Sequence, residues 1–313
     1  SIVPVAENTD VLEKKFLQAG GNIIVDKMSE NVNLEGHHFN ITNPQHYAEL
    51  ILKKTIPAKI ILSSASFIEL NGRLNNTFSK ITQKKELTVA FLGGSITYNP
   101  GWRDKLCQYF QETYPQTQFR FIPAGIPSLG SLPHSFRLQT DVLDKGKIDL
   151  LFIEAAVNDH ANNTKEEIQR KAMEGIIRHA LSSNPSMDIV LMAFADEDKI
   201  NDYEKNKEPA EVKVHRQLAM HYNLPFINLS KEVYKRIQNG EFTWKDDFKD
   251  LHPSLFGQNV YYQTMKTMLQ QCEENYNGEN IVDAKLPAQK VGGVYNNGVY
   301  VDVHKATKLK GFS

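Results

Sequence analysis

Ser95 stands where a side chain could do chemistry. It follows the apolar run 87–92 and the pair Gly93-Gly94 in the segment FLGGSITYNPGW. A buried strand ending on a tight glycine turn would hold the hydroxyl at the carboxyl edge of a sheet, near backbone N–H groups that can stabilise an oxyanion. A serine that caps the next helix would look similar. The segment lacks the Gly-Lys-Ser/Thr ending of a phosphate loop and the spacing of a dinucleotide fingerprint, which disfavours nucleotide binding.

His252 is the residue best placed to activate such a serine. It lies in the late segment FTWKDDFKDLHPSLFGQ, directly before a predicted helix and close behind several aspartates. A serine nucleophile needs a base within hydrogen-bond reach, and the base works best when a carboxylate orients its ring and stabilises its cation. Four further histidines remain unassigned candidates: His134, His160, His215 and His221.

Two groups that could stabilise an oxyanion follow other predicted strands. Asn158 comes after the apolar run 148–157, and its amide could donate a hydrogen bond, although an Asx turn would use the same residue. The loop AGIPSLGS offers a backbone N–H at Gly130 or Ser128, although a plain turn would look identical. The carboxyl ends of parallel strands meet at one edge of a sheet, so these groups are expected on the same rim as Ser95.

The elements that must position these groups alternate between residues 87 and about 275. Short apolar runs predict strands, and near-continuous ones such as DLLFIE suit strands covered on both faces. Segments with apolar residues at helical spacing lie between them. The predicted strands are 87–92, 118–124, 148–157, 187–195 and 224–229, and the predicted helices are 102–114, 135–146, 165–183, 209–223 and 254–276. This alternation predicts βαβ units around a parallel sheet, an α/β fold.

The two ends of the chain do not show the alternation of strands and helices that is predicted for the central part. The N-terminal segment is expected to be an accessory element, partly β, with a helical pattern at 11–20 and strand-like runs at 48–54 and 58–70. The C-terminal segment is expected to be a β extension with YNNGVY as a hairpin turn. The predicted divisions are therefore 1–84, 85–278 and 279–313.

The charge balance, the apolar runs and the cysteine count of the chain limit which partners and sites are expected. Lys plus Arg is 36 against 37 for Asp plus Glu, so the net charge of -1 gives no reason to expect nucleic acid. No apolar run approaches the roughly 20 residues that span a bilayer. Cys107 and Cys272 are too few for a disulfide framework or a cysteine zinc site. No feature indicates an oligomeric state.

Taken together, GGSIT, the glycine loop after the second strand, VND and LHPS resemble the SGNH (GDSL-type) hydrolase family, which has Ser, Gly, Asn and His blocks in this order. The resemblance covers residues 87 to about 275. It implies a three-layer, flavodoxin-like α/β/α fold and esterase chemistry that requires no metal or other cofactor. Longer stretches such as AFLGGSITYNPGWRDKL are similar to a bacterial branch linked to carbohydrate deacetylation.

Carried over by this resemblance, Ser95 would be the nucleophile and His252 the general base. The backbone N–H of Ser95, Gly130 and Asn158 would form the oxyanion hole. Gly130 is preferred to Gly125 because a donor further along the loop reaches inward more easily, and Ser128 stays open as an alternative.

The block around the histidine departs from the family pattern. The usual aspartate three residues before the histidine is replaced by Lys249. Asp250 is the preferred orienting carboxylate; Asp247, or no carboxylate at all, remains an alternative.

The expected substrate is a short acyl ester, O-acetyl above all, on a polysaccharide or oligosaccharide, because no long apolar lid is visible. Tyr98, Trp102 and His160 are candidate substrate contacts near the rim, as is Trp244, although each aromatic residue could equally belong to the core. A GDSL-type lipase, lysophospholipase or thioesterase is the alternative enzyme. A carbohydrate-binding protein that has lost its chemistry is the alternative outside enzymes, kept open by the displaced aspartate.

The location is expected to be outside the cytoplasm, periplasmic or extracellular. The chain begins at Ser1 rather than Met, and a polysaccharide substrate favours export. A cytoplasmic location would contradict no residue.

Overall fold

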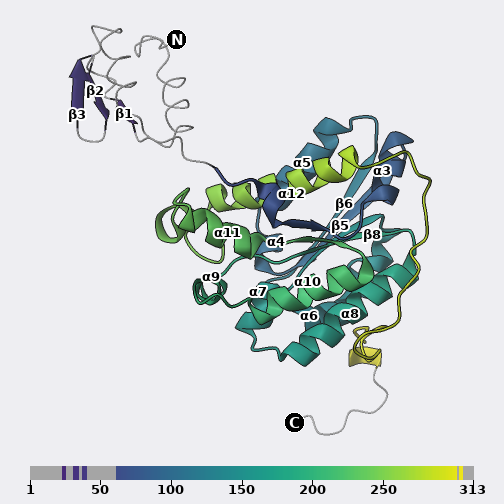
Figure 1. The fold of residues 1–313 in the computed structure, drawn as a ribbon. Helices are drawn as coiled ribbons and strands as arrows, with labels where there is room; N and C mark the ends of the chain where they lie inside the picture. Colours follow the sequence, from purple (N-terminus) through teal and green to yellow (C-terminus); the bar gives the residue numbers. More distant parts are fainter. Residues whose placement is uncertain (1–22, 26–30, 35–36, 41–60, 302, 306–313) are drawn as a thin grey trace. The chain divides into compact units, whose positions relative to one another are not determined.

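The structure is a computed structural model that describes residues 23–25, 31–34, 37–40, 61–301 and 303–305. The chain forms two compact units, Ser1–Leu62 and Ser63–Ser313. In the first unit, β1 (Ile23–Val25), β2 (Asn31–Leu34) and β3 (His37–Asn40) form an antiparallel sheet (Figure 1). The helix predicted at 11–20 and the strand predicted at 48–54 lie outside the described residues.

The described part of the second unit is built on a six-stranded sheet with the order β4-β9-β8-β7-β5-β6. Its strands are β4 (Ile68–Leu70), β5 (Leu87–Gly93), β6 (Phe119–Gly125), β7 (Leu150–Glu154), β8 (Asp188–Met192) and β9 (Pro225–Ile227). The edge strand β4 pairs antiparallel with β9, and every other pairing is parallel. The predicted parallel sheet is confirmed, with one antiparallel edge strand added.

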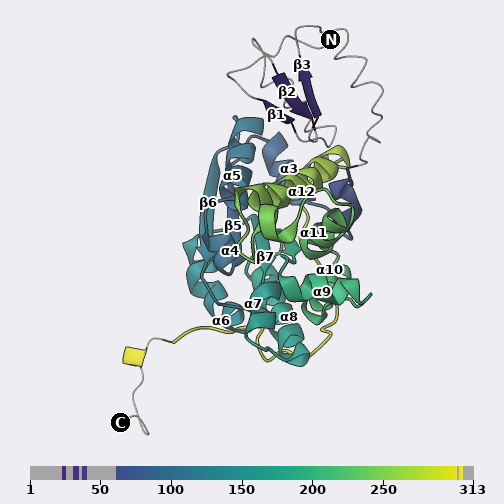
Figure 2. The same cartoon turned by 90° about the vertical axis from the view of Figure 1, so that its left-hand side faces the viewer.

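Helices cover both faces of this sheet. The longer ones are α3 (Asn75–Thr82), α5 (Trp102–Thr113), α6 (Ser131–Asp141), α8 (Glu166–Ser183), α9 (Glu197–Glu204), α10 (Ala210–Tyr222), α11 (Leu229–Gln238) and α12 (Leu255–Glu274). Figures 1 and 2 show α5 and α12 on one side of the sheet and α6, α8 and α10 on the other. The predicted three-layer α/β/α fold is confirmed.

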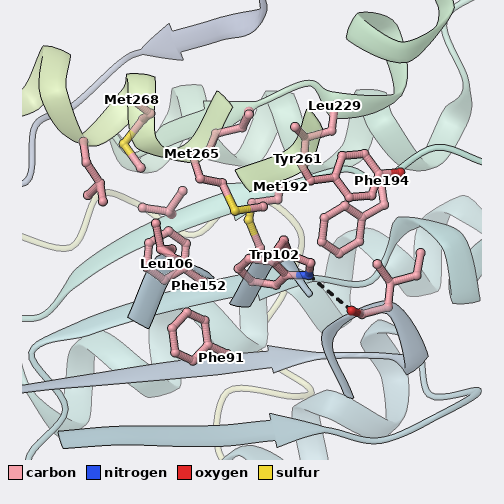
Figure 3. Packing of buried hydrophobic residues seen from close by; sticks show 14 of the residues in the cluster. Phe91, Trp102, Leu106, Phe152, Met192, Phe194, Leu229, Tyr261, Met265 and Met268 are labelled. Carbon is pink, nitrogen blue, oxygen red and sulfur yellow. Dashed lines mark hydrogen bonds between the residues drawn. The ribbon is translucent and has the colours of Figure 1, made fainter. Parts of the chain in front are cut away.

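The alternation of side chains along β5 explains why two layers can form. Val89 and Phe91 lie in the core beneath α5 and α12, whereas Ala90 and Leu92 lie in the core beneath α6 and α8. A strand that is apolar at every position can bury both of its faces, because successive side chains point to opposite sides. In the first core, Phe91 stacks on Phe152 with ring centroids 5.4 Å apart (Figure 3).

Two boundaries differ from the sequence prediction for visible physical reasons. The strand predicted at 148–157 ends at Glu154, and α7 (Ala156–Ala161) follows, because Glu154 Oε1 accepts the backbone N–H of Val157 at 3.2 Å and starts a helical turn. Residues 63–84 belong to the second unit and not to the N-terminal segment, because β4 pairs with β9 and the Thr77 N–H of α3 donates to Asp188 at 2.7 Å.

The C-terminal stretch 279–301 is an extended strap and contains no strand among its described residues, which corrects the predicted β extension. Its backbone N–H groups donate to side chains and backbone carbonyls of helices and loops instead of a neighbouring strand. Val282 N–H donates to Asn76 Oδ1 of α3, Ala284 N–H to Pro185 O, and Tyr300 N–H to Phe136 O of α6. The strap is the yellow segment that passes from α3 to α6 and α8 in Figure 1.

Glu174 on α8 holds this strap. Its buried carboxylate accepts the backbone N–H groups of Lys290 at 2.6 Å and Val291 at 2.7 Å, and the hydroxyl of Tyr222 at 2.7 Å. We expect Glu174→Gln to lower stability by about 1–3 kcal/mol, because an amide N–H₂ would then face a backbone donor. A lower Tm and faster proteolytic cleavage within 279–301 should result. Glu167→Gln, at an exposed position of the same helix, is the matched control and should change neither quantity.

Candidate functional site

Ser95 opens a short helical turn directly beyond the carboxyl end of β5. This turn, α4 (Ser95–Tyr98), follows Gly94, and the backbone N–H of its first residue has no partner within the turn, as at every helix start. Ser95 Oγ lies 2.8 Å from His252 Nε2, so the predicted nucleophile and base are within hydrogen-bond distance although 157 positions apart. The strand order reverses at β5, since β6 lies on one side and β7 on the other, and ligands of α/β sheets bind at such a point.

Trp102 lies in the core, bonds to the Ser95 turn from there and does not face the site. Its indole is fully buried and donates from Nε1 to the Ile96 carbonyl at 3.2 Å, the dashed line in Figure 3. Its backbone N–H donates to Gln258 Oε1 of α12 at 3.1 Å. The prediction that Trp102 contacts substrate is therefore wrong, because the Phe91, Phe152 and Phe194 rings enclose it. The residue ties the Ser95 turn to the helix that follows His252.

The three segments expected to stabilise an oxyanion converge beside Ser95. A Cβ atom at Gly94 would lie 1.9 Å from Asn158 Oδ1 and 3.6 Å from the Leu129 carbonyl. A Cβ atom at Gly130 would lie 3.3 Å from the Asn158 carbonyl carbon. Asn158 is 9% exposed, and within the described residues its Nδ2 has no hydrogen-bond acceptor. A side chain at Gly94 would clash with the Asn158 amide, and one at Gly130 would clash with Asp159, which explains why glycine is needed at both positions.

The structure separates Gly130 from the alternatives that the sequence left open. Gly125 packs under the α4 turn, where an added Cβ would lie 2.4 Å from Tyr98 N. Ser128 adopts a left-handed backbone with φ of 65°, and its carbonyl accepts Asn162 Nδ2 at 2.9 Å. Of the two glycines, Gly130 is the one at which an added Cβ would meet Asn158.

His252 is held in a loop between an irregular turn and α12. The π-helical turn Trp244–Phe248 is followed by Lys249 with φ of 87°, and Ser254 then caps α12 by accepting the Gly257 N–H. Ser254 N–H donates back to the Phe248 carbonyl at 2.9 Å. These bonds define where the chain re-enters the rim, and they leave the His252 ring facing Ser95.

The two candidate orienting carboxylates lie in different places. Asp247 Oδ2 accepts the backbone N–H of Thr243 at 2.7 Å and its hydroxyl at 3.0 Å, so this carboxylate caps its own turn. Asp250 Oδ1 accepts the backbone N–H of His252 at 2.5 Å and lies 3.9 Å from the ring Nδ1. Asp250 is thus beside the ring without hydrogen bonding to Nδ1.

We expect Asp250→Ala to reduce the kcat of a reaction that uses the Ser95–His252 pair by only about two- to fivefold, because an exposed ion pair contributes on the order of 0.2–1 kcal/mol. Asp246→Ala, an exposed aspartate of the same loop, is the control and should leave kcat unchanged. A loss of a hundredfold or more in Asp250→Ala would mean that the carboxylate swings onto Nδ1 during turnover.

The other candidate substrate contacts, Tyr98, His160 and Trp244, differ in how exposed their side chains are. Tyr98 is 57% exposed and follows Ser95 by one helical turn. His160 is on the surface, where its ring contacts Asp198 at 3.0 Å and Glu211 at 3.4 Å. Trp244 is partly buried and stacks on Phe248 with centroids 4.9 Å apart. Tyr98 therefore has a ring face to offer a ligand, whereas His160 is engaged by carboxylates.

The remaining histidines have structural surroundings. Burial lowers the pKa of His134 to about 3 and that of His215 to about 4, so both are neutral core residues at ordinary pH. His221 Nε2 lies 2.8 Å from the Ala288 carbonyl of the strap.

Glu154 at the end of β7 and Asp159 in α7 are two buried acids, and sequence reasoning missed the burial of Asp159. Burial raises the pKa of Glu154 to about 7 and that of Asp159 to about 6. Asp159 directly follows Asn158 in VND, where an aspartate is typical of the start of a helix and does not indicate a buried side chain. Only the tertiary structure shows that its carboxylate is fully buried against Ser131.

No group of three or more His, Cys, Asp or Glu side chains suited to a metal ion occurs within the described residues. In the same part of the chain, every helix is too short or too polar to cross a bilayer. Cys107 and Cys272 are both free thiols.

Comparison with known proteins gives a family and a fold. The model of the GDSL-like Lipase/Acylhydrolase family matches residues 91–260, more than half of the chain. No curated protein matches the chain.

Among solved structures, the chain is similar to a two-domain esterase (CEX) active on acetylated mannans, at 22% identity and a TM-score of 0.66 over 76% of this chain and 64% of that one. The same esterase co-crystallized with mannopentaose gives 24% identity and a TM-score of 0.62 over 74% and 61% of the two chains. The chain thus spans less than two thirds of that esterase. LAE5, an alpha/beta hydrolase enzyme from the metagenome of Lake Arreo, Spain, gives 14% identity and a TM-score of 0.52 over 60% and 96%. At these identities the likeness establishes the fold.

Proposed function

We propose that this chain, which belongs to the GDSL-like lipase/acylhydrolase family and is a carboxylic ester hydrolase, removes O-acetyl groups from a polysaccharide or oligosaccharide. The observation that carries the proposal is the 2.8 Å contact between Ser95 Oγ and His252 Nε2 at the carboxyl edge of the sheet. A hydroxyl held at that distance from an imidazole can pass its proton to the ring as it attacks a carbonyl carbon.

The proposed mechanism has two halves that use the same residues. In the first, His252 accepts the Ser95 proton, Ser95 Oγ attacks the ester carbonyl, and the oxyanion is held by the backbone N–H groups of Ser95 and Gly130 and by the Asn158 amide. His252 then gives the proton to the departing sugar oxygen, which leaves an acyl-enzyme. In the second half, His252 removes a proton from water, which attacks the acyl carbon. The bond between the acyl carbon and Ser95 Oγ then breaks, His252 returns the proton to Oγ, and the carboxylic acid leaves.

The surface near the pair can receive a sugar ring or a short acyl group. Exposed apolar side chains follow the two residues closely: Tyr98 comes after Ser95, and Leu255 and Phe256 come after His252. Such side chains can pack against a sugar ring or a short acyl group. The mannan esterase with the same fold acts on an acetylated glycan, which points to the same substrate class here. A polymeric substrate also favours a location outside the cytoplasm, and fractionation of the producing cells would test that.

The test is release of acetate from acetylated mannan and acetylated xylan, with p-nitrophenyl acetate and a p-nitrophenyl ester of an eight-carbon acid measured alongside. We expect turnover of at least one acetylated glycan and a higher kcat/KM for the acetyl than for the octanoyl ester. Preference for the longer ester would support a lipase or thioesterase instead. Glycan binding without any ester turnover would support a protein that has lost its chemistry.

A further inference from the structure

We propose that Asp159 is a positioning residue of the oxyanion hole, whose buried carboxylate fixes the Gly130 loop against Asn158 so that both donors face one oxygen atom. The proposal rests on the proposed ester hydrolysis and adds to it a residue that touches neither substrate nor the Ser95–His252 pair. Its basis is the geometry between the start of α6 and α7.

The carboxylate joins two segments that are far apart in sequence. Asp159 Oδ1 accepts the backbone N–H of Ser131 at 2.8 Å and the Ser131 hydroxyl at 2.9 Å. Ser131 directly follows Gly130, and Asp159 directly follows Asn158, so the two bonds lie one residue from each proposed donor. Both Asp159 and Ser131 are fully buried, and buried hydrogen bonds to a carboxylate are stronger than exposed ones.

The fit at Gly130 shows how closely the two segments are held. A Cβ atom at this position would lie 2.4 Å from Asp159 Oδ1 and 3.0 Å from the Asp159 backbone nitrogen. The loop therefore approaches α7 to a distance that only glycine permits. A carboxylate that draws the loop this close determines the direction of the Gly130 N–H relative to the Asn158 amide.

The surroundings of Asp159 indicate which of its properties matters. Its second oxygen, Oδ2, is buried and has no hydrogen-bond donor within the described residues. Glu211 of α10 and Lys199 of α9 act on it with opposite electrostatic effects. Oδ1 is thus the atom that holds Ser131 and the Gly130 loop against α7. An asparagine keeps an acceptor at that place and should preserve the function.

The experiment measures kcat and KM with p-nitrophenyl acetate for the full chain and for Asp159→Ala, Asp159→Asn and Gly130→Ala, with Tm for each. The matched control is Asp149→Ala. Asp149 is also a buried carboxylate that accepts a backbone N–H, from Thr88 at 2.9 Å, but it lies at the amino end of β7, away from the rim.

We expect Asp159→Ala to lower kcat by about 10- to 100-fold with KM changed less than about twofold. Misaligned donors would stabilise the oxyanion of the transition state less well but would leave substrate binding intact. Asp159→Asn should keep kcat within about threefold of the parent. Gly130→Ala should also lower kcat, because its added Cβ would displace the Asp159 carboxylate. If Asp159→Ala does not fold, Ser131→Ala tests the proposal: it removes the hydroxyl bond to Asp159 Oδ1 and should lower kcat with KM little changed, and an unchanged kcat would overturn the proposal. Asp149→Ala should lower Tm without lowering kcat per folded molecule.

A folded Asp159→Ala with kcat within about threefold of the parent would overturn the proposal. Equal losses in the alanine and asparagine variants would overturn it too, because the charge and not the Oδ1 acceptor would then matter. A parent protein that hydrolyses no ester would instead overturn the proposed function, and the two failures are distinct because the second is seen before any Asp159 variant is measured.

Discussion

Ser95→Ala is expected to lower kcat for acetyl-ester hydrolysis by at least about 10³-fold, with the fold and Tm preserved. The hydroxyl lies 2.8 Å from His252 Nε2, so its removal leaves the base without this nucleophile to activate. Ser95 is partly exposed, and loss of its Oγ opens no core cavity. Steady-state acetate release, with Tm from a thermal melt, is the measurement.

The matched variants make this result specific. Ser182→Ala, at an exposed position near the end of α8, controls for serine replacement and should behave as the parent. His252→Ala should cost about as much as Ser95→Ala, and the double variant little more than either, because the two residues act as one unit. A rate for Ser95→Ala within tenfold of the parent would show that Ser95 is a helix-capping turn residue and not a nucleophile.

The fold was predictable wherever the local pattern carried the cause. The apolar runs of β5 and β7 and the glycines before Ser95 specify a buried strand, a sharp turn and a presented hydroxyl without reference to distant residues. Helix α3 and the edge strand β4, which lies inside the predicted strand run 58–70, were assigned to the N-terminal segment because β4 pairs with β9, which is far away in sequence. Short edge elements depend on tertiary pairing, which one segment cannot reveal.

The site was predictable in residue type but not in orientation. The pairing of Ser95 with His252 followed from the chemistry that each needs. Trp102, in contrast, was placed on the rim because its neighbours are there, whereas a helical turn carries its indole into the core. Burial is a property of three dimensions, so sequence also gave no sign that Asp159 is fully enclosed or that Asp247 is bound to Thr243.

Asn158→Ala is expected to lower kcat by about 10²- to 10³-fold with little change in KM, the usual cost of removing one oxyanion donor. The amide stands beside Gly94, next to the Ser95 turn, and its Nδ2 has no acceptor within the described residues. A donor that meets its acceptor only when the carbonyl oxygen becomes negative contributes to the transition state more than to substrate binding. Asn201→Ala, at an exposed position of α9, is the control.

The isosteric variant Asn158→Asp separates donation from packing. If Asn158 served only to fill the space against Gly94, Asn158→Asp would keep the shape of the side chain and should lower kcat less than Asn158→Ala does. If its amide donates to an oxyanion, an ionised aspartate presents only acceptors and repels the developing negative charge. We therefore expect kcat of Asn158→Asp to be no higher than that of Asn158→Ala at neutral pH, with an intact Tm. Activity near that of the parent in Asn158→Asp would assign oxyanion stabilisation to the backbone N–H groups of Ser95 and Gly130 alone.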